Sequence, residues 1–203
     1  VVVASDTFAQ RNQGMSSQES VEVAAGLVAG AREAGIRSTV TIGASFGCPF
    51  EGDVPVSRLR EIISQVVDAA PDELALADTI GVAVPRDVTE RMGIARSLAP
   101  ADMPLRLHLH DTRHTGVANA VAALAAGVSA LDSSIGGTGG CPFAPKATGN
   151  VATEDLVYLF DRSGVTTGVD LESILETTAW LEERLGKPLP GALLRAGSFP
   201  PKQ

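Results

Sequence analysis

A repeated unit of a short apolar run, a polar or glycine-containing loop and an amphipathic helix constrains the fold of this chain most strongly. Five apolar runs have the length and the side-chain types expected of β-strands, and each is followed by a helical pattern. These runs are residues 1–4, 38–46, 73–77, 105–109 and 129–135. Strands and helices that alternate along a chain form parallel sheets with crossover helices, so we predict an α/β fold.

The predicted helices have recognisable starts. Ser16 precedes Glu19 by three residues in a capping-box pattern, so a helix should follow a polar loop over residues 5–15 and end at Gly35. Further helices are predicted over residues 55–70, 85–98, 117–126, 154–160 and 170–185. A proline opens the first two of these further helices, and Thr153 is the expected cap of the helix at 154–160.

The loops after the strands would share one mouth if the chain formed a (β/α)8 TIM barrel. That mouth would gather Asp78, His108, His110, Cys141 and Asn150. Five units are three fewer than the barrel needs, so we predict a single domain over residues 1–203 that lacks the first three β/α units of a TIM barrel. Missing residues before Val1 are the favoured explanation, because an open strand edge there would expose unpaired backbone. Completion of the barrel by another chain is the alternative.

Composition narrows the classes of function and location. The net charge is −8, and no run of Lys or Arg offers a local basic patch, which argues against a nucleic-acid partner. Two cysteines cannot make a disulfide framework, so we expect a reducing compartment, the cytoplasm. The sequence contains no apolar segment of about eighteen residues and no basic-then-apolar leader, so we expect no membrane span and no signal peptide.

A histidine pair lies in the fourth predicted strand. Residues 105–110 alternate leucine with Arg106, His108 and His110, and this period of two places both imidazoles on one face of the strand. Two nitrogen ligands at the carboxyl end of a parallel strand suit a metal site. The alternative to a metal site is a pair of polar residues that have only a structural role and are hydrogen-bonded at a strand end.

Several loop motifs resemble the 3-hydroxy-3-methylglutaryl-CoA lyase family, in that family's order and over nearly the whole chain. They are Gly47-Cys-Pro-Phe-Glu-Gly52, Asp78-Thr-Ile-Gly81, Leu107-His-Leu-His-Asp-Thr112, Gly139-Gly-Cys-Pro-Phe-Ala144 and the stretch 148–158. The combination is far more specific than any single motif. It places the chain in a metal-dependent barrel group that also contains isopropylmalate synthase, homocitrate synthase and the carboxyltransferase domain of pyruvate carboxylase.

The resemblance implies a set of site residues. His108 and His110 match the two metal-binding histidines of the lyases, and Asn150 matches their amide ligand, around Mg²⁺ or Mn²⁺. Cys141 matches the catalytic cysteine of the glycine-rich loop. His108 could also share in proton transfer.

The other candidate residues also have purely structural explanations. Asp78 matches an acidic residue at the lyase mouth and could hold substrate, but a turn carboxylate is an equally good reading. A lone cysteine in a loop is more often inert than catalytic, and Cys48 is expected to be inert. His114 is expected on the loop surface.

The sequence also departs from the family pattern. Arg113-His114 stands where the lyases often have Tyr-Gly, and Ala77 replaces the usual Gly before the Asp-Thr-Ile-Gly loop. The first change lies at the expected mouth and bears on acyl-CoA selectivity. The family's first strand supplies a metal-binding Asp and a catalytic Arg, and no stretch of these 203 residues matches that strand.

The activity implied by the resemblance is retro-Claisen cleavage of 3-hydroxy-3-methylglutaryl-CoA, or a similar 3-hydroxyacyl-CoA, to acetoacetate and acetyl-CoA. Such lyases serve leucine degradation and ketone body metabolism, and we expect an acyl-CoA substrate and a homodimer. Three alternatives remain. A condensing synthase of the same group should carry a different loop at residues 139–142, and a metal hydrolase would need ligands beyond His114, after which no histidine occurs. The third is an inactive, truncated barrel that acts only as a structural subunit.

Overall fold

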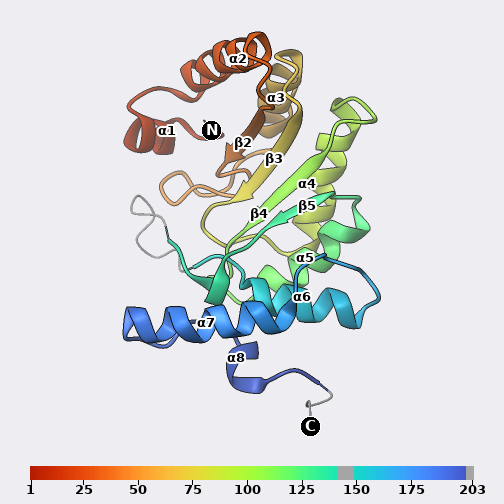
Figure 1. Ribbon diagram of the computed structural model, residues 1–203. Coiled ribbons are helices and arrows are strands. Elements are labelled where there is room, and N and C mark those ends of the chain that lie inside the picture. Colours follow the sequence, from red (N-terminus) through yellow and green to blue (C-terminus); the bar gives the residue numbers. More distant parts are fainter. Residues whose placement is uncertain (141–148, 200–203) are drawn as a thin grey trace.

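The computed structural model describes residues 1–140 and 149–199, and its centre is an open, fully parallel sheet (Figure 1). The strands are β1 (Val2–Val3), β2 (Thr39–Gly43), β3 (Glu73–Asp78), β4 (Leu105–Leu109) and β5 (Ala130–Asp132). They pair in sequential order, β1-β2-β3-β4-β5. The predicted α/β fold with a parallel sheet is therefore confirmed.

Helices connect the strands and continue beyond them. They are α1 (Asp6–Gln13), α2 (Ser17–Glu33), α3 (Val56–Asp68), α4 (Pro85–Leu98), α5 (Gly116–Ala125), the 3-10 turn η1 (Ile135–Gly137), α6 (Thr153–Arg162), α7 (Leu171–Leu185) and α8 (Leu193–Ala196). Figure 1 shows α2, α3, α4 and α5 side by side along one face of the sheet, whereas the long helix α7 crosses the end near β5. Helix α7 contacts η1 and α6 there.

The helix-covered face of the sheet is the apolar core. Leu74 and Leu76 of β3 are fully buried, and so are Leu105, Leu107 and Leu109 of β4. Because successive side chains of a strand point to opposite faces, the residues between these leucines point to the other face. We call the helix-covered face the outer face and the opposite one the inner face.

The capping box predicted at Ser16 is present. The Glu19 N–H donates to Ser16 Oγ at 3.2 Å, and the Ser16 N–H donates to Glu19 Oε2 at 2.7 Å. Helix α2 ends at Glu33, and Gly35 beyond it has a φ of +67°. Both ends of this helix were therefore predictable from local sequence.

Two local predictions are wrong. Residues 5–15 are not a loop, because helix α1 fills most of them and buries Phe8 and Ala9. The Asp6 carboxylate ties α1 to the next helix by accepting the Ser17 N–H at 2.8 Å. Thr153 does not cap α6; it is the first helical residue, and its Oγ1 lies 2.8 Å from Ser133 Oγ.

The fifth strand is shorter than the predicted range of 129–135, because a later segment inserts beside its end. The Val151 N–H donates to the Leu109 carbonyl and the Ser134 N–H donates to the Val151 carbonyl, both at 3.1 Å. Residues 149–152 thus lie between the end of β4 and the chain beyond β5. The sheet is part of a barrel, and the number of absent units, three, stays a prediction. Within the described residues no helix has the length and apolar character needed to cross a membrane.

Candidate metal centre

Strand β4 carries the polar side chains of the inner face. Its burial alternates, with the leucines buried and Arg106 and His108 partly exposed. His110 follows the strand directly and is buried. The two imidazole rings have centroids 5.2 Å apart and an interplanar angle of 65°. Both rings therefore lie at the carboxyl end of β4, as the alternation predicted.

Asn150 comes to the same place from forty positions further along the chain. It forms an isolated antiparallel bridge with His110. The flanking bonds, Asp111 N–H to Gly149 O and Val151 N–H to Leu109 O, make this a pair without direct hydrogen bonds between its members. Side chains of such a pair project from one face and lie closest together. The carboxamide of Asn150 and the imidazole of His110 are therefore neighbours.

The carboxamide of Asn150 is held in one orientation. Its Nδ2 donates to the Thr138 carbonyl at 3.2 Å, whereas its Oδ1 is buried and has no hydrogen-bond partner among the described residues. A Cβ on Gly139, whose φ is +117°, would lie 2.8 Å from Nδ2, so only glycine leaves room for this amide. A buried carboxamide oxygen without a partner is costly unless something else binds it.

This donor set fits a hard divalent cation. Two imidazoles and one carboxamide oxygen are ligands that Mg²⁺ or Mn²⁺ accepts, and waters or substrate oxygens can complete an octahedral shell. In the parts of the chain that the structure describes, no cluster of three or more His, Cys, Asp and Glu side chains has metal-binding geometry. The candidate centre therefore depends on the amide oxygen of Asn150 as its third protein ligand.

Asp78 lies on the other side of the sheet. It follows Ala77, the register partner of His108, so its side chain belongs to the outer face. Its carboxylate is fully buried and accepts the N–H groups of Val82 and Ala83, each at 3.0 Å. Burial raises the pKa of Asp78, although these two hydrogen bonds favour the ionised form. Its contacts are those of a turn carboxylate that shapes the loop before α4.

The two cysteines of the chain are Cys48 and Cys141. Cys141 lies outside the described residues. Cys48 is buried, and its sulfur accepts a hydrogen bond from Ser5 Oγ at 3.0 Å. The Phe50 and Glu51 N–H groups also reach this sulfur at 3.4 Å, so the thiol organises its own loop.

Three charged residues of the inner face escaped the sequence-based selection. Glu73, Arg106 and Asp132 come from three neighbouring strands, and the register places them on the same face as His108. Hydrogen bonds from His108 and then from Arg106 lower the pKa of Asp132 despite its partial burial. Charged residues inside otherwise apolar strands were the available signal.

The departures from the family pattern have a structural account. Arg113 donates from Nη1 to the carbonyl oxygens of Ile80 and Gly81, at 3.0 and 2.9 Å. It thereby joins the loop after β4 to the loop after β3. Ala77 lies beside His108 in the register, so its small side chain leaves space for the imidazole. The side chain of His114 is 96% exposed, as expected of loop surface.

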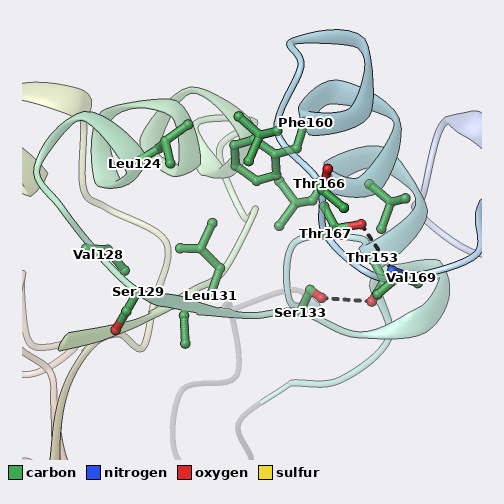
Figure 2. A pocket seen from close by; sticks show the side chains of 14 residues that line it. Leu124, Val128, Ser129, Leu131, Ser133, Thr153, Phe160, Thr166, Thr167 and Val169 are labelled. Carbon is green, nitrogen blue, oxygen red and sulfur yellow. Dashed lines mark hydrogen bonds between the residues drawn. The ribbon is translucent and has the colours of Figure 1, made fainter. Parts of the chain in front are cut away.

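Two cavities lie near these elements. One of about 270 Å³ borders Asn150, with Asp111 and Asp155 in its wall. Figure 2 shows the other, about 340 Å³, between β5, α5 and α6. Its wall is largely apolar, and two of its hydroxyl-bearing residues, Ser133 and Thr153, are hydrogen-bonded to each other. No titratable side chain appears among the described residues that line the second cavity, so the chemistry is assigned to the His108 end of β4.

Comparisons with known proteins agree with this placement. A family model described as HMGL-like matches residues 1–181. The (R)-citramalyl-CoA lyase of Chloroflexus aurantiacus is 43% identical over 202 residues, which are 100% of this chain and 63% of that protein. A hydroxymethylglutaryl-CoA lyase of Bacillus subtilis is 38% identical over 192 residues, or 95% of this chain and 64% of that protein.

Solved structures give the same result. The HMG-CoA lyase of Bacillus subtilis matches with a TM-score of 0.90 and 38% identity, covering 96% of this chain and 65% of that one. An HMG-CoA lyase from Acenitobacter baumannii, in complex with coenzyme A and 3-methylmalate, matches with a TM-score of 0.92 and 32% identity, covering 100% and 66%. The resemblance to HMG-CoA lyases is confirmed, and the chain spans less than two thirds of the length of these relatives.

Proposed function

The chain belongs to the HMGL-like family, and from this premise we propose that the protein carrying it is a divalent-metal-dependent lyase that cleaves a carbon–carbon bond of a 3-hydroxyacyl-CoA. The observation that supports this most is the meeting of His108, His110 and Asn150 at the end of β4, where Oδ1 of Asn150 is buried. Among the described residues no group donates a hydrogen bond to this amide oxygen, so its lone pairs can bind a cation.

In this proposal, His108, His110 and Asn150 would bind the ion. When bound there, Mg²⁺ or Mn²⁺ supplies Lewis acidity that lowers the pKa of a coordinated hydroxyl and fixes the orientation of the substrate. The chain's own part is to keep both imidazoles and the amide oxygen in place. The Thr138 carbonyl does this for Asn150, the strand register does it for His108, and the bridge with Asn150 does it for His110.

The proposed reaction is retro-Claisen cleavage. The 3-hydroxyl of the substrate gives its proton to water or to His108, and its oxygen forms the ketone as the bond between C2 and C3 breaks. The electron pair of that bond stays with C2, which gives the thioester enolate as co-product. C2 of the enolate then takes up a proton, which we assign to the thiol of Cys141. His108 has a smaller part in proton transfer, because its Nδ1 faces the Asp132 carboxylate at 3.4 Å. Asp78 shapes the neighbouring loop, and we give it no contact with substrate.

Two substrates fit this proposal. The first is 3-hydroxy-3-methylglutaryl-CoA, which yields acetoacetate and acetyl-CoA. The second is citramalyl-CoA, favoured by the 43% identity to a protein of that name, and it yields pyruvate and acetyl-CoA. The two thioesters differ by one methylene in the acid arm, and a pocket typically discriminates against one methylene by about 10- to 200-fold. The same residues could therefore serve either substrate.

The test is a cleavage assay on the full-length protein with each thioester, with Mg²⁺ and after chelation. We expect acetyl-CoA release that requires the ion, with acetoacetate or pyruvate identifying the substrate. The Cys141→Ala variant should lower turnover by about 10²- to 10⁴-fold and retain ion binding. Cys48→Ser is the matched control and should keep turnover. Absence of cleavage of both thioesters would refute the proposal, and unchanged turnover of Cys141→Ala would remove that residue from the mechanism.

A further inference from the structure

A continuous chain of polar contacts crosses the inner face of the sheet and ends at a ring nitrogen of His108. Glu73 Oε2 accepts hydrogen bonds from Thr39 Oγ1 at 2.8 Å and from Arg106 Nε at 3.0 Å. The same guanidinium contacts Asp132 Oδ1 through Nη1 at 2.7 Å. The other oxygen of Asp132, Oδ2, lies 3.4 Å from His108 Nδ1. Strands β2 to β5 all contribute to this chain.

The two oxygens of Asp132 therefore have different partners. One faces the guanidinium of Arg106, and the other faces the imidazole of His108. Arg106 is itself fixed, because Glu73 lies beside it with only 5% of its side chain exposed. A planar guanidinium held by two carboxylates has little rotational freedom. Arg106 consequently holds the carboxylate of Asp132 through Oδ1, while Oδ2 faces His108.

This arrangement decides which nitrogen of His108 is available. A carboxylate oxygen next to Nδ1 favours the tautomer that carries its proton on Nδ1, so the lone pair is on Nε2. Histidines that bind metal ions generally donate their other N–H to a carboxylate, which orients the ring and makes the ligating nitrogen more basic. The contact between Asp132 and His108 has this form.

We propose that Asp132 is the positioning residue for His108 as a metal ligand, and that Arg106, held by Glu73, keeps Asp132 in position. The inference rests on the proposed function, since it assumes that His108 binds the ion. It assigns a role to residues from three strands that the metal ligands alone do not require. A merely structural ion-pair network would stabilise the sheet without affecting the state of the His108 ring.

The first experiment measures Mn²⁺ affinity of the full-length protein by titration calorimetry. Asp132→Asn keeps the shape of the side chain and removes its charge. We expect its Mn²⁺ affinity to fall by about 10- to 100-fold, the usual effect of losing a carboxylate behind a histidine ligand. Glu61→Gln, which removes a carboxylate from the exposed pair with Arg58, is the matched control and should keep the wild-type affinity.

The second measurement reads the imidazole directly. The ring ¹⁵N signals of His108 are identified as those that disappear in His108→Ala. In the ion-free wild type we expect His108 to carry its proton on Nδ1. In Asp132→Asn the signals should move toward a mixture of tautomers. A role limited to sheet stability would leave them unchanged.

Arg106→Lys is the second variant and keeps the experiment decisive if Asp132→Asn does not fold. Lysine retains the charge but cannot bridge Glu73 and Asp132 with a planar fork. We expect a smaller loss of Mn²⁺ affinity, within about 10-fold, together with the same direction of change in the His108 ring. Wild-type affinity and an unchanged ring signal in the variants that fold would overturn the inference.

Failure of the proposed function has a different signature. If the wild-type protein bound no Mn²⁺, or if His110→Ala bound it as tightly as wild type, the metal centre itself would be wrong. If wild type bound Mn²⁺, His110→Ala lost it, and Asp132→Asn kept it, only the positioning role of Asp132 would fall.

Discussion

The two faces of strand β4 have opposite chemistry although their residues alternate along five positions. On the outer face Leu105, Leu107 and Leu109 are buried under the helices. On the inner face Arg106 and His108 remain partly exposed and are oriented by carboxylates of the adjoining strands. The outer face therefore stabilises the fold, whereas on the inner face hydrogen-bond partners fix the orientation of each side chain.

A pair of buried glutamates repeats this contrast elsewhere. Glu73 on the inner face and Glu154 at the start of α6 are both almost inaccessible to solvent. Burial opposes ionisation of Glu73, but hydrogen bonds from Arg106 and Thr39 lower its pKa below the usual value. Burial raises the pKa of Glu154, whose Oε2 accepts the Gly136 N–H and whose Oε1 has no partner in the part of the chain that the structure describes. Partners, and not depth alone, decide the charge of a buried carboxyl.

The largest expected effect tests the outer face. Leu107 is fully buried, so Leu107→Ala should lower the free energy of unfolding by about 2–5 kcal/mol, through lost burial and a residual cavity. Chemical denaturation measures this. Leu27→Ala, at a 69% exposed position of α2, is the control and should change stability by less than about 0.5 kcal/mol. Equal losses in the free energy of unfolding for Leu107→Ala and Leu27→Ala would contradict the division into two faces.

The next effect tests the inner face. His110→Ala should reduce Mn²⁺ affinity by more than about 100-fold, because losing a ligand costs more than losing the carboxylate behind one. Calorimetry measures the affinity, and thermal unfolding checks that the fold persists. His114→Ala changes an exposed imidazole four residues away in sequence and should bind Mn²⁺ normally. The comparison would fail if both variants behaved alike.

A smaller effect tests the contact between the loops after β3 and β4. Gly81 has a φ of +59°, and a Cβ there would lie 2.8 Å from the Thr112 side chain and 2.9 Å from its backbone nitrogen. Gly81→Ala should lower the free energy of unfolding by about 1–3 kcal/mol and weaken Mn²⁺ binding through displacement of the His110 loop. Gly127→Ala, with a φ of +76° and open space, isolates the cost of the backbone alone. Similar losses and intact Mn²⁺ binding in both variants would argue against coupled loops.

The smallest effect is a pH dependence with opposite signs for the two glutamates. The folded pKa of Glu73 lies below its unfolded value, so its stabilisation is complete above about pH 4.5 and is lost as the pH falls through the folded pKa. The folded pKa of Glu154 lies above 4.5, so its contribution is complete below that pH and is lost as the pH rises through the folded pKa.

Melting temperatures across pH measure both signs. Glu73→Gln should flatten the acid side of the stability profile, and Glu154→Gln should gain stability relative to wild type as the pH rises above about 4.5. Profiles that shift in the same direction for both variants would show that the partners of Glu73 do not offset its burial.

Local periodicity was sufficient to predict most of the fold. The alternation in β4 and the capping box at Ser16 depend only on neighbours in sequence, and both are present. Helix α1 was missed because its sequence is mostly polar and only Phe8 and Ala9 are buried, so tertiary contacts and not an apolar stripe determine it. The predicted end of β5 was wrong, because the Ser134 N–H donates to the carbonyl of Val151, a residue that lies far along the chain.

The candidate site divides in the same way. His108, His110 and Asn150 were selected because their motifs resemble a family, and the structure brings the three to one end of β4. The contacts of Asp132 and Arg106 could not be predicted, because they require the register of separate strands. Asp78 shows the limit of a motif, since a single step along β3 turns its carboxylate to the outer face. The expected homodimer stays a prediction.

The central claim, a divalent-ion centre formed by the inner face of β4 with Asn150, is tested most directly by pulsed electron paramagnetic resonance of the Mn²⁺-loaded full-length protein. With ¹⁵N-labelled histidine, the account predicts coupling of the ion to two imidazole nitrogens, reduced to one in His110→Ala and unchanged in His114→Ala. Mn²⁺ that shows no coupling to histidine nitrogen, or the same coupling after His110→Ala, would contradict it.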